Sequence, residues 1–431
     1  MNPLAKKLND DLDPIVLEML SERGKNAYYP SGGILAQSAE ARGVPLNATI
    51  GIATDGNGTP LVLDSVSSST PGLQKNAYSY APSAGDDKLR GLWGRMIYEK
   101  NPSINPQTKI SNPVVTAGLT QALDAAGYLF LDKGETVIIP DLFWDNYNLI
   151  FSKWSESDSP LSTFPLFDDD EFNIPGFSDQ LNSPGDKKLV LFNAPNNPTG
   201  YTPSNKKIYE IVGVINEAAN DGKKIVFIAD DAYFGYFYSD DASKESIFSK
   251  LCVLDENVLA IKCDAATKED FIWGGRIGFT TYGRKGMTDK SFNALEQKTA
   301  GYVRGNTSNS SNIAQNILLK AYASPSYSEE KAKAFGILKG RYDTVRDILD
   351  SHAEYNECFE SLPFNSGYFM CLKLKNGLDA NEVRQSLIKN YGVGVIENNG
   401  FLRINYTSVD KESLPVVFDS IYSACKSKIA A

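Results

Sequence analysis

Between residues 113 and 280, short β-branched and aromatic runs alternate with longer amphipathic segments, and this alternation limits the possible folds most. The runs have the length of buried strands: PVVTA (113–117), TVIIP (136–140), KLVLFNAP (188–195), KIVFIADDAY (224–233), LAIKCDAA (259–266) and RIGFTTY (276–282). The segment 204–222 is typical of a helix, with Ser204 as its N-cap and Gly222 at its end. Strands that alternate with helices form a mostly parallel sheet between helices, so the sequence predicts an α/β fold.

The chain is long enough for two hydrophobic cores, since 431 residues exceed the usual size of one domain. After residue 310 a long charged helix is followed by strands and helices on a smaller scale. The capping-box spacing of Ser326 and Glu329 predicts where that helix begins. We expect a large domain over residues 50–310 and a smaller α+β domain formed by residues 1–49 and 311–431.

Composition excludes several classes of protein. The net charge of −10 argues against a nucleic-acid surface, which needs clustered Lys and Arg. Five cysteines without CxxC spacing favour a reducing compartment, and neither a signal peptide nor a membrane span is expected, so we predict a cytoplasmic protein. His352 is the only histidine, which excludes His-based metal cages, and its position predicts a helix end at the surface. No metal is expected.

Unusual polar residues follow the predicted strands. Asn197 follows KLVLF, Asp230 and Tyr233 follow IVFIA, and Lys268 follows LAIK, with Arg276 eight residues further on. In an open parallel sheet, ligands bind beyond the carboxyl ends of the strands. We therefore expect these side chains to meet in one crevice.

These stretches resemble the fold type I pyridoxal-phosphate enzymes, and among them the class I and II aminotransferases of the aspartate and aromatic aminotransferase type. The resemblance rests on NNPTG (196–200), ADDAY (229–233), a lysine in DAATKEDFIWGGRIGF (264–279), and RIN (403–405). Their order and spacing agree as well, and the resemblance covers roughly residues 50–410.

The resemblance implies that pyridoxal 5′-phosphate is the cofactor and that Lys268 carries it as an aldimine and later moves the substrate's proton. It also implies that Asp230 keeps the ring nitrogen protonated. Asn197 and Tyr233 would donate hydrogen bonds to the ring's phenolic oxygen. Asp231 is interpreted as a turn residue or as support for its neighbour.

The phosphate would bind where a helix begins directly after a strand. Backbone N–H groups near Gly118, Leu119 and Thr120, with the Thr120 hydroxyl and the Arg276 guanidinium, would supply the donors. The sequence departs from the family at Ala265, where a serine or threonine is common. We expect Thr267 or the backbone to replace that hydroxyl.

Four more residues take roles from the resemblance. Trp144 would stack on the pyridine ring, and Arg403 would bind the substrate α-carboxylate. Tyr80 would reach the phosphate of a neighbouring subunit, which implies a homodimer with shared active sites. Arg304 resembles an arginine that crosses the same interface to bind a distal carboxylate.

The predicted function is therefore transfer of an amino group between an acidic or aromatic L-amino acid and a 2-oxo acid. A pyridoxal-phosphate-dependent C–S lyase that catalyses β-elimination stays open as an alternative, because no residue separates the two. A non-catalytic cofactor-binding regulator is less favoured, since the ~50 residues before the match leave no room for a DNA-binding domain. No GxGxxG motif supports a nicotinamide dehydrogenase, and Walker A spacing is absent.

Overall fold

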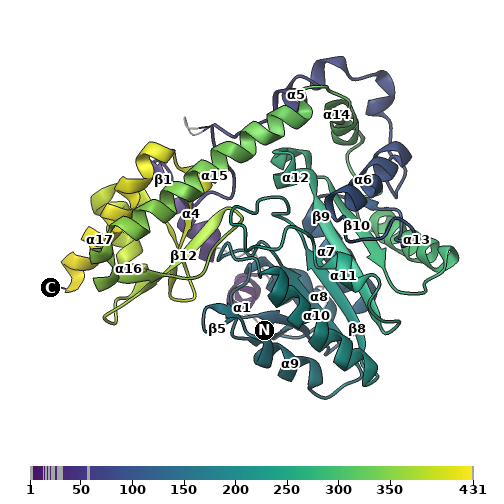
Figure 1. The fold of residues 1–431 in the computed structure, drawn as a ribbon, viewed down its shortest axis with the longest axis horizontal. Coiled ribbons are helices and arrows are strands. Elements are labelled where there is room, and N and C mark those ends of the chain that lie inside the picture. Colours follow the sequence, from purple (N-terminus) through teal and green to yellow (C-terminus); the bar gives the residue numbers. More distant parts are fainter. Residues whose placement is uncertain are drawn as a thin grey trace.

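The computed structural model describes residues 3–12, 14, 17, 20, 25–26, 33–55 and 59–429. Its centre is a seven-stranded mixed sheet of order β2-β10-β9-β8-β7-β3-β4 (Figure 1). The strands are β2 (Val114–Thr116), β3 (Val137–Pro140), β4 (Leu161–Phe164), β7 (Lys187–Asn193), β8 (Lys224–Asp230), β9 (Val258–Ala265) and β10 (Gly278–Gly283). β10 is antiparallel to both of its neighbours, and the other pairs are parallel. The predicted α/β fold is confirmed, although β4 was not predicted.

Helices cover both faces of this sheet, because successive side chains of a strand point to opposite faces. In β7, Leu189 and Leu191 join one core cluster and Val190 and Phe192 the other. The first cluster includes α7 (Leu119–Phe130) and α8 (Asn146–Ser155). The second includes α6 (Asp87–Lys100), α9 (Ile174–Asn182), α10 (Asn205–Asn220), α11 (Phe248–Leu251) and α14 (Asn312–Tyr322). α13 (Asp289–Asn306) packs against α7.

Three predicted helix boundaries are confirmed, because α10 begins after Ser204 and ends before Gly222, and α15 begins directly after Ser326. Ser204 accepts a hydrogen bond from the N–H of Lys207 at the start of α10, and Gly222 follows its end with a φ of 93°. The predicted capping box at Ser326 does not form, because Ser326 has helical backbone angles and makes no cap bond. Its hydroxyl instead donates to Glu330, whose other carboxylate oxygen accepts from Ser65.

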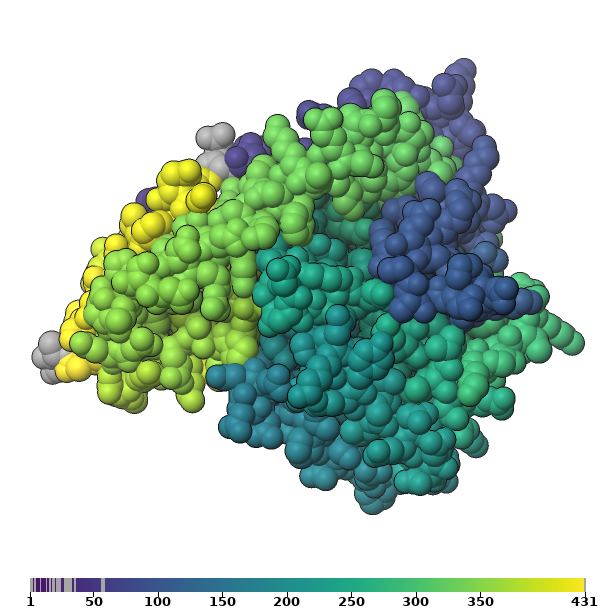
Figure 2. All heavy atoms as spheres, in the orientation of Figure 1, coloured from purple at the N-terminus to yellow at the C-terminus, as the bar shows by residue number. Residues whose placement is uncertain are grey.

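The C-terminal part contains a four-stranded antiparallel sheet of order β11-β12-β15-β14. Its strands are β11 (Phe359–Ser361), β12 (Phe369–Leu374), β14 (Ile396–Asn398) and β15 (Phe401–Asn405). The helices around it are α15 (Tyr327–Ser351), α16 (Ala380–Ser386) and α17 (Leu414–Ile429). α15 runs diagonally from this part toward the top of the large sheet (Figure 1). In Figure 2 the yellow-green C-terminal residues pack directly against the teal residues of the large sheet.

Part of the N-terminal segment packs against the C-terminal part. α4 (Gly33–Glu40) contacts β14, and β1 (Leu46–Asn47) pairs with β13 (Val393–Gly394). The other elements are α1 (Pro3–Asp10), α5 (Asp64–Ser67), β5 (Phe167–Asp168), β6 (Glu171–Phe172), α12 (Ala266–Glu269) and short 3₁₀ or π turns. The proposed domain boundaries stay a prediction.

The structure bears on the predictions about cysteines, membrane spans and the single histidine. All five cysteines are buried as free thiols. Within the described part of the chain, no helix combines the length and the apolar character needed to cross a membrane. Much of the first 32 residues, on which the prediction of no signal peptide rests, lies outside the described residues. His352 is the C-cap residue directly after α15, at a helix end as predicted.

Candidate active site

A cavity of about 310 Å³ opens beyond the carboxyl ends of β7, β8 and β9. This is the place where an open parallel sheet binds its ligands. The predicted site residues that line it are Leu119, Thr120, Trp144, Asn197, Asp230, Tyr233, Lys268, Arg276 and Arg403. Its other lining residues are Ile34, Ser38, Thr49, Gly51, Tyr147, Asn193, Ala232, Thr267 and Phe369.

Lys268 lies in α12, the short helix that follows β9. Its Nζ is 4.7 Å from the centroid of the Tyr233 ring. Burial outweighs the opposing charge of Asp230 and, together with the charge of Arg276, lowers the pKa of Lys268 to about 8. The amine therefore loses its proton at a lower pH than an ordinary lysine does, which suits a nucleophile or a base.

Asp230 is the last residue of β8 and is completely enclosed. Its Oδ2 accepts a hydrogen bond of 2.6 Å from the Tyr147 hydroxyl, and its Oδ1 accepts from the N–H of Ala232 at 3.0 Å. Burial raises the pKa of Asp230 to about 6, although both hydrogen bonds and Lys268 oppose that shift. The carboxyl group is thus mostly ionised at neutral pH and can pair with a cation in the cavity.

Tyr147 is a site residue whose contact with Asp230 was not predicted. It is the second residue of α8, and its N–H donates to the carbonyl of Trp144 at 2.9 Å in the turn that precedes the helix. The two rings lie 5.5 Å apart with an interplanar angle of 83°. The spacing of three residues from Trp144 was the available signal.

The asparagine-rich turn after β7 is held by its own amides. The side chain of Asn193 accepts from the Asn197 N–H at 2.7 Å and donates to the Asp230 carbonyl at 3.0 Å. The Asn196 side chain accepts from the Thr199 N–H at 3.1 Å. Gly200 has a φ of 72°, and a Cβ there would lie 2.0 Å from the carbonyl oxygen of Phe369. The turn therefore needs glycine to approach β12, and it fixes Asn197 at the cavity.

Arg403 reaches the cavity from β15, and only 3% of it is exposed. Its Nη1 donates to Oδ1 of Asn197 at 3.2 Å, and its guanidinium lies 4.5 Å from the centroid of the Phe369 ring. Among the described residues, Nε of Arg403 has no hydrogen-bond partner. Burial lowers the pKa of Arg403, but a guanidinium stays protonated. A buried cation with an unused donor suits a carboxylate ligand.

The other end of the cavity has the donors that a phosphate needs. α7 begins after Gly118, and the first N–H groups of a helix have no partner within it. A Cβ on Gly118 would lie 2.6 Å from Nη2 of Arg276, so glycine permits the arginine to lie over the helix start. Ala265 is buried and offers no hydroxyl, but Oγ1 of Thr267 is buried without a partner in the described part of the chain. These residues fit the phosphate of pyridoxal phosphate.

Three predicted site residues do not line the cavity of their own chain: Gly118, which directly precedes α7, Tyr80 and Arg304. Tyr80 is 89% exposed, and Arg304 is exposed near the end of α13. Their roles across a subunit interface stay predictions. No cluster of three His, Cys, Asp or Glu side chains arranged for a metal ion occurs among the residues that the structure describes.

Sequence reasoning also missed the N-terminal wall of the cavity. Ile34 and Ser38 line it from α4, one helical turn apart. The side chain of Gln37 ties α4 to Glu397, since it donates to the Glu397 carbonyl at 2.9 Å and accepts from its N–H at 2.6 Å. This contact joins residues 360 positions apart, and no local pattern indicates it.

The chain matches the family model described as "Aminotransferase class I and II" over residues 47–421. It belongs to this family. The matched region contains every residue that lines the cavity except Ile34 and Ser38. The cavity therefore lies almost entirely within the part of the chain that matches the aminotransferases.

Individual relatives and solved structures agree with this assignment. The aminotransferase is 24% identical to the aspartate aminotransferase of Pyrococcus horikoshii over 354 residues, which cover 80% of this chain and 82% of the relative. It is 25% identical to the probable aspartate aminotransferase of Methanocaldococcus jannaschii, over 48% of this chain, and spans half of that relative's length. The crystal structure of an aminotransferase from Anaerococcus prevotii superimposes with a TM-score of 0.82 at 25% identity, covering 94% of this chain and 99% of that chain.

Proposed function

We propose that this chain is a pyridoxal-phosphate-dependent aminotransferase that moves an amino group between an L-amino acid and a 2-oxo acid. The observation that carries the proposal is one cavity lined by an amine of lowered pKa, a buried carboxylate and a buried guanidinium with an unused donor: Lys268, Asp230 and Arg403. The three groups suit three separate tasks of such a reaction. Membership of the family and similarity to aspartate aminotransferases support the same conclusion.

Pyridoxal phosphate, when bound, supplies an aldehyde that condenses with amines and a protonated ring that accepts electrons from the substrate's α-carbon. Asp230 would hold the proton on the ring nitrogen, and Tyr147 orients that carboxylate through its 2.6 Å hydrogen bond. Asn197 and Tyr233 would donate to the phenolic oxygen. The ring face would stack on Trp144. The phosphate would be held by Arg276, Thr120, Thr267 and the N–H groups that follow Gly118.

Lys268 and Arg403 would act on the substrate itself. Arg403 binds the α-carboxylate through Nε and its terminal nitrogens, which orients the bond between the α-carbon and its hydrogen. Lys268 Nζ would then remove the proton from the substrate's α-carbon and deliver it to the C4′ carbon of the cofactor. A pKa near 8 leaves a useful fraction of this amine unprotonated at neutral pH.

The substrate side chain would be aromatic or acidic. Trp144, Phe369 and Ile34 offer an apolar wall for an aromatic ring. An acidic side chain would need a further cation, and we propose that Arg304 supplies it from the second subunit of a homodimer. Tyr80 would cross the same interface to the neighbour's phosphate.

A screen of amino donors with 2-oxoglutarate as acceptor tests the proposal. Aromatic donors, aspartate or both should yield glutamate and the matching 2-oxo acid. Arg304→Ala should reduce turnover of aspartate and leave aromatic turnover unchanged; equal aspartate turnover in both proteins would remove the role of Arg304. Release of ammonia and pyruvate from cystathionine, without glutamate formation, would instead identify a C–S lyase.

A further inference from the structure

Tyr236 lies three residues after Tyr233, in the loop that follows β8, and is 4% exposed. Its hydroxyl donates a hydrogen bond of 2.6 Å to the main-chain carbonyl of Lys268. The side chain therefore contacts the backbone of the residue whose amine lines the cavity.

The main chain of Tyr236 contacts the other sheet. Its carbonyl accepts a hydrogen bond of 2.8 Å from the N–H of Gly367, two residues before β12 begins. β12 pairs with β15, where Cys371 lies opposite Arg403. One residue thus joins the backbone of Lys268 to the sheet that carries Arg403.

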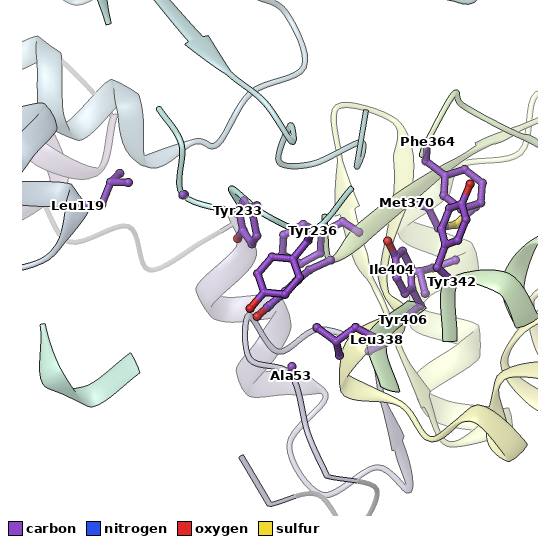
Figure 3. Close-up of a cluster of buried hydrophobic side chains, with 14 of the residues drawn as sticks. Ala53, Leu119, Tyr233, Tyr236, Leu338, Tyr342, Phe364, Met370, Ile404 and Tyr406 are labelled. Atoms are coloured by element: carbon purple, nitrogen blue, oxygen red, sulfur yellow. The ribbon is translucent and has the colours of Figure 1, made fainter. Parts of the chain in front are cut away.

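Ring contacts fix Tyr236 between these two regions. Its ring lies 5.2 Å from that of Tyr368 and 6.0 Å from that of Phe271, both at steep angles. Figure 3 shows Tyr236 between Tyr233 on one side and the side chains of Met370, Ile404 and Tyr406 on the other. Packing on both sides holds the ring in place, with its hydroxyl 2.6 Å from the Lys268 carbonyl oxygen.

The helix that carries Lys268 is too short to hold its own position. α12 has four residues, so it provides little internal hydrogen bonding. The next residues are tied elsewhere: Asp270 pairs with Lys331 at 3.1 Å and accepts from the Tyr322 hydroxyl at 2.8 Å. The N–H of Phe271 also donates to the Lys268 carbonyl, at 3.2 Å, but this hydrogen bond lies within the same turn as Lys268. Among the described residues, the Tyr236 hydroxyl is the hydrogen-bond donor that reaches this carbonyl from outside the turn.

We propose that Tyr236 is a positioning residue for Lys268, which holds the lysine's backbone in register with the sheet that carries Arg403. The proposal rests on the proposed function, because it assumes that Lys268 moves the substrate's proton while Arg403 holds the carboxylate. Loss of the hydroxyl would let the amine move relative to the bound α-carbon. A small misplacement of a reacting group is enough to slow proton transfer.

The chain offers a matched control. Tyr238 is also buried, and its hydroxyl has no hydrogen-bond partner among the described residues. Its ring packs against Phe335 and Tyr342, at 5.6 and 5.1 Å, away from Lys268. Tyr236→Phe and Tyr238→Phe each remove one buried hydroxyl, but only the first removes a contact with Lys268.

The experiment compares the full-length wild type with both variants after loading with pyridoxal phosphate. For Tyr236→Phe we expect the single-turnover rate with an amino acid to fall about tenfold, with the donor's KM within about twofold, as for one lost hydrogen bond that acts on the reacting step. The fraction of Lys268 that borohydride fixes to limiting cofactor should fall as well. Tyr238→Phe should match the wild type in both measurements.

A second background separates positioning from a general effect on the fold. In the Lys268→Ala variant, with methylamine added as the external base, adding Tyr236→Phe should change the single-turnover rate by less than about twofold, because Tyr236 acts through Lys268. An equal loss in both backgrounds, or equal behaviour of the Tyr236→Phe and Tyr238→Phe variants, would overturn the proposal. A wild type that neither binds pyridoxal phosphate nor turns over amino acids would instead contradict the proposed function.

Discussion

Lys262 and Lys268 lie six residues apart, and both are enclosed by the protein, yet their electrostatic surroundings are opposite. The side chain of Lys262 is 2% exposed and forms ion pairs with Asp231 and, at 3.3 Å, with Asp264. Burial alone would lower the pKa of Lys262, but the two carboxylates raise it above its ordinary value. Lys268 forms no such ion pair with the residues that the structure describes, and burial outweighs the charge of Asp230 and lowers the pKa of Lys268 to about 8.

The sheet geometry produces this difference. The side chains of β9 alternate between the faces, so Ile261 and Cys263 join the core cluster of α7 and α8, and Lys262 points the other way. There Asp264 also accepts a hydrogen bond of 3.1 Å from the Trp93 indole on α6. Lys268 comes after the strand has ended, where the cavity begins. Ion-pair partners, rather than burial, therefore decide which lysine is a structural cation and which is a reactive amine.

The largest effect is expected from removing the reactive amine. Lys268→Ala should lower kcat/KM on the order of 10⁴-fold, because the same group serves as the cofactor's attachment point and the base. Steady-state kinetics measure this loss, and circular dichroism should show an unchanged fold. Activity within tenfold of the wild type would remove Lys268 from the mechanism.

Removing the structural cation should act on stability instead. Lys262→Met leaves the carboxylates of Asp231 and Asp264 buried without their cation, which should cost about 3–5 kcal/mol of unfolding free energy. Urea unfolding measures this. The control is Lys285→Met at an exposed lysine, expected to stay within about 0.5 kcal/mol of the wild type. A cost below about 1 kcal/mol for Lys262→Met would mean that the ion pairs are not needed there.

The cation on the second sheet should affect substrate binding. Arg403→Lys keeps the charge but loses the planar fork, so the donor's KM should rise about 10- to 100-fold with a smaller change in kcat. Titration of initial rates with the amino donor separates the two constants. A fall in kcat at constant KM would place Arg403 in another role.

The smallest effect is a pH dependence that differs between the two lysines. In the cofactor-free chain, the pKa of Lys268 is about 8 when folded and roughly 10.4 when unfolded, so the unfolded state binds more protons between these values. The stability difference between wild type and Lys268→Met should therefore rise between about pH 8 and 10, by at most about 1.4 kcal/mol per unit. The same difference for Lys262→Met should stay flat, because Lys262 keeps its proton in both states over this range. If the stability differences of Lys268→Met and Lys262→Met changed with pH at the same slope, the two lysines would not differ in the way described.

Local patterns predicted one of these lysines and not the other. Lys268 follows a strand and has Arg276 eight residues on, so a motif indicated it. Lys262 lies within the predicted strand run, and nothing local shows that Asp231, the residue after the neighbouring strand β8, forms an ion pair with it. The α/β fold was predictable from periodicity, but the order of the strands was not.

The same limit applies to the cavity. Asn197 and Asp230 were predictable because parallel strands end at one edge of the sheet. The wall formed by Ile34 and Ser38 depends on a helix that packs against β14, far along the chain. The hydroxyl of Tyr236 on the Lys268 carbonyl depends on loop geometry that no spacing rule gives.

We infer that Lys268, and not the ion-paired Lys262, is the lysine that reacts with the cofactor. Mixing the purified chain with pyridoxal phosphate, reducing it with borohydride and mapping the modified peptide by mass spectrometry tests this directly. We expect one label per chain, on Lys268, and none on Lys262. A label on Lys262, or a chain that takes up no label, would contradict it.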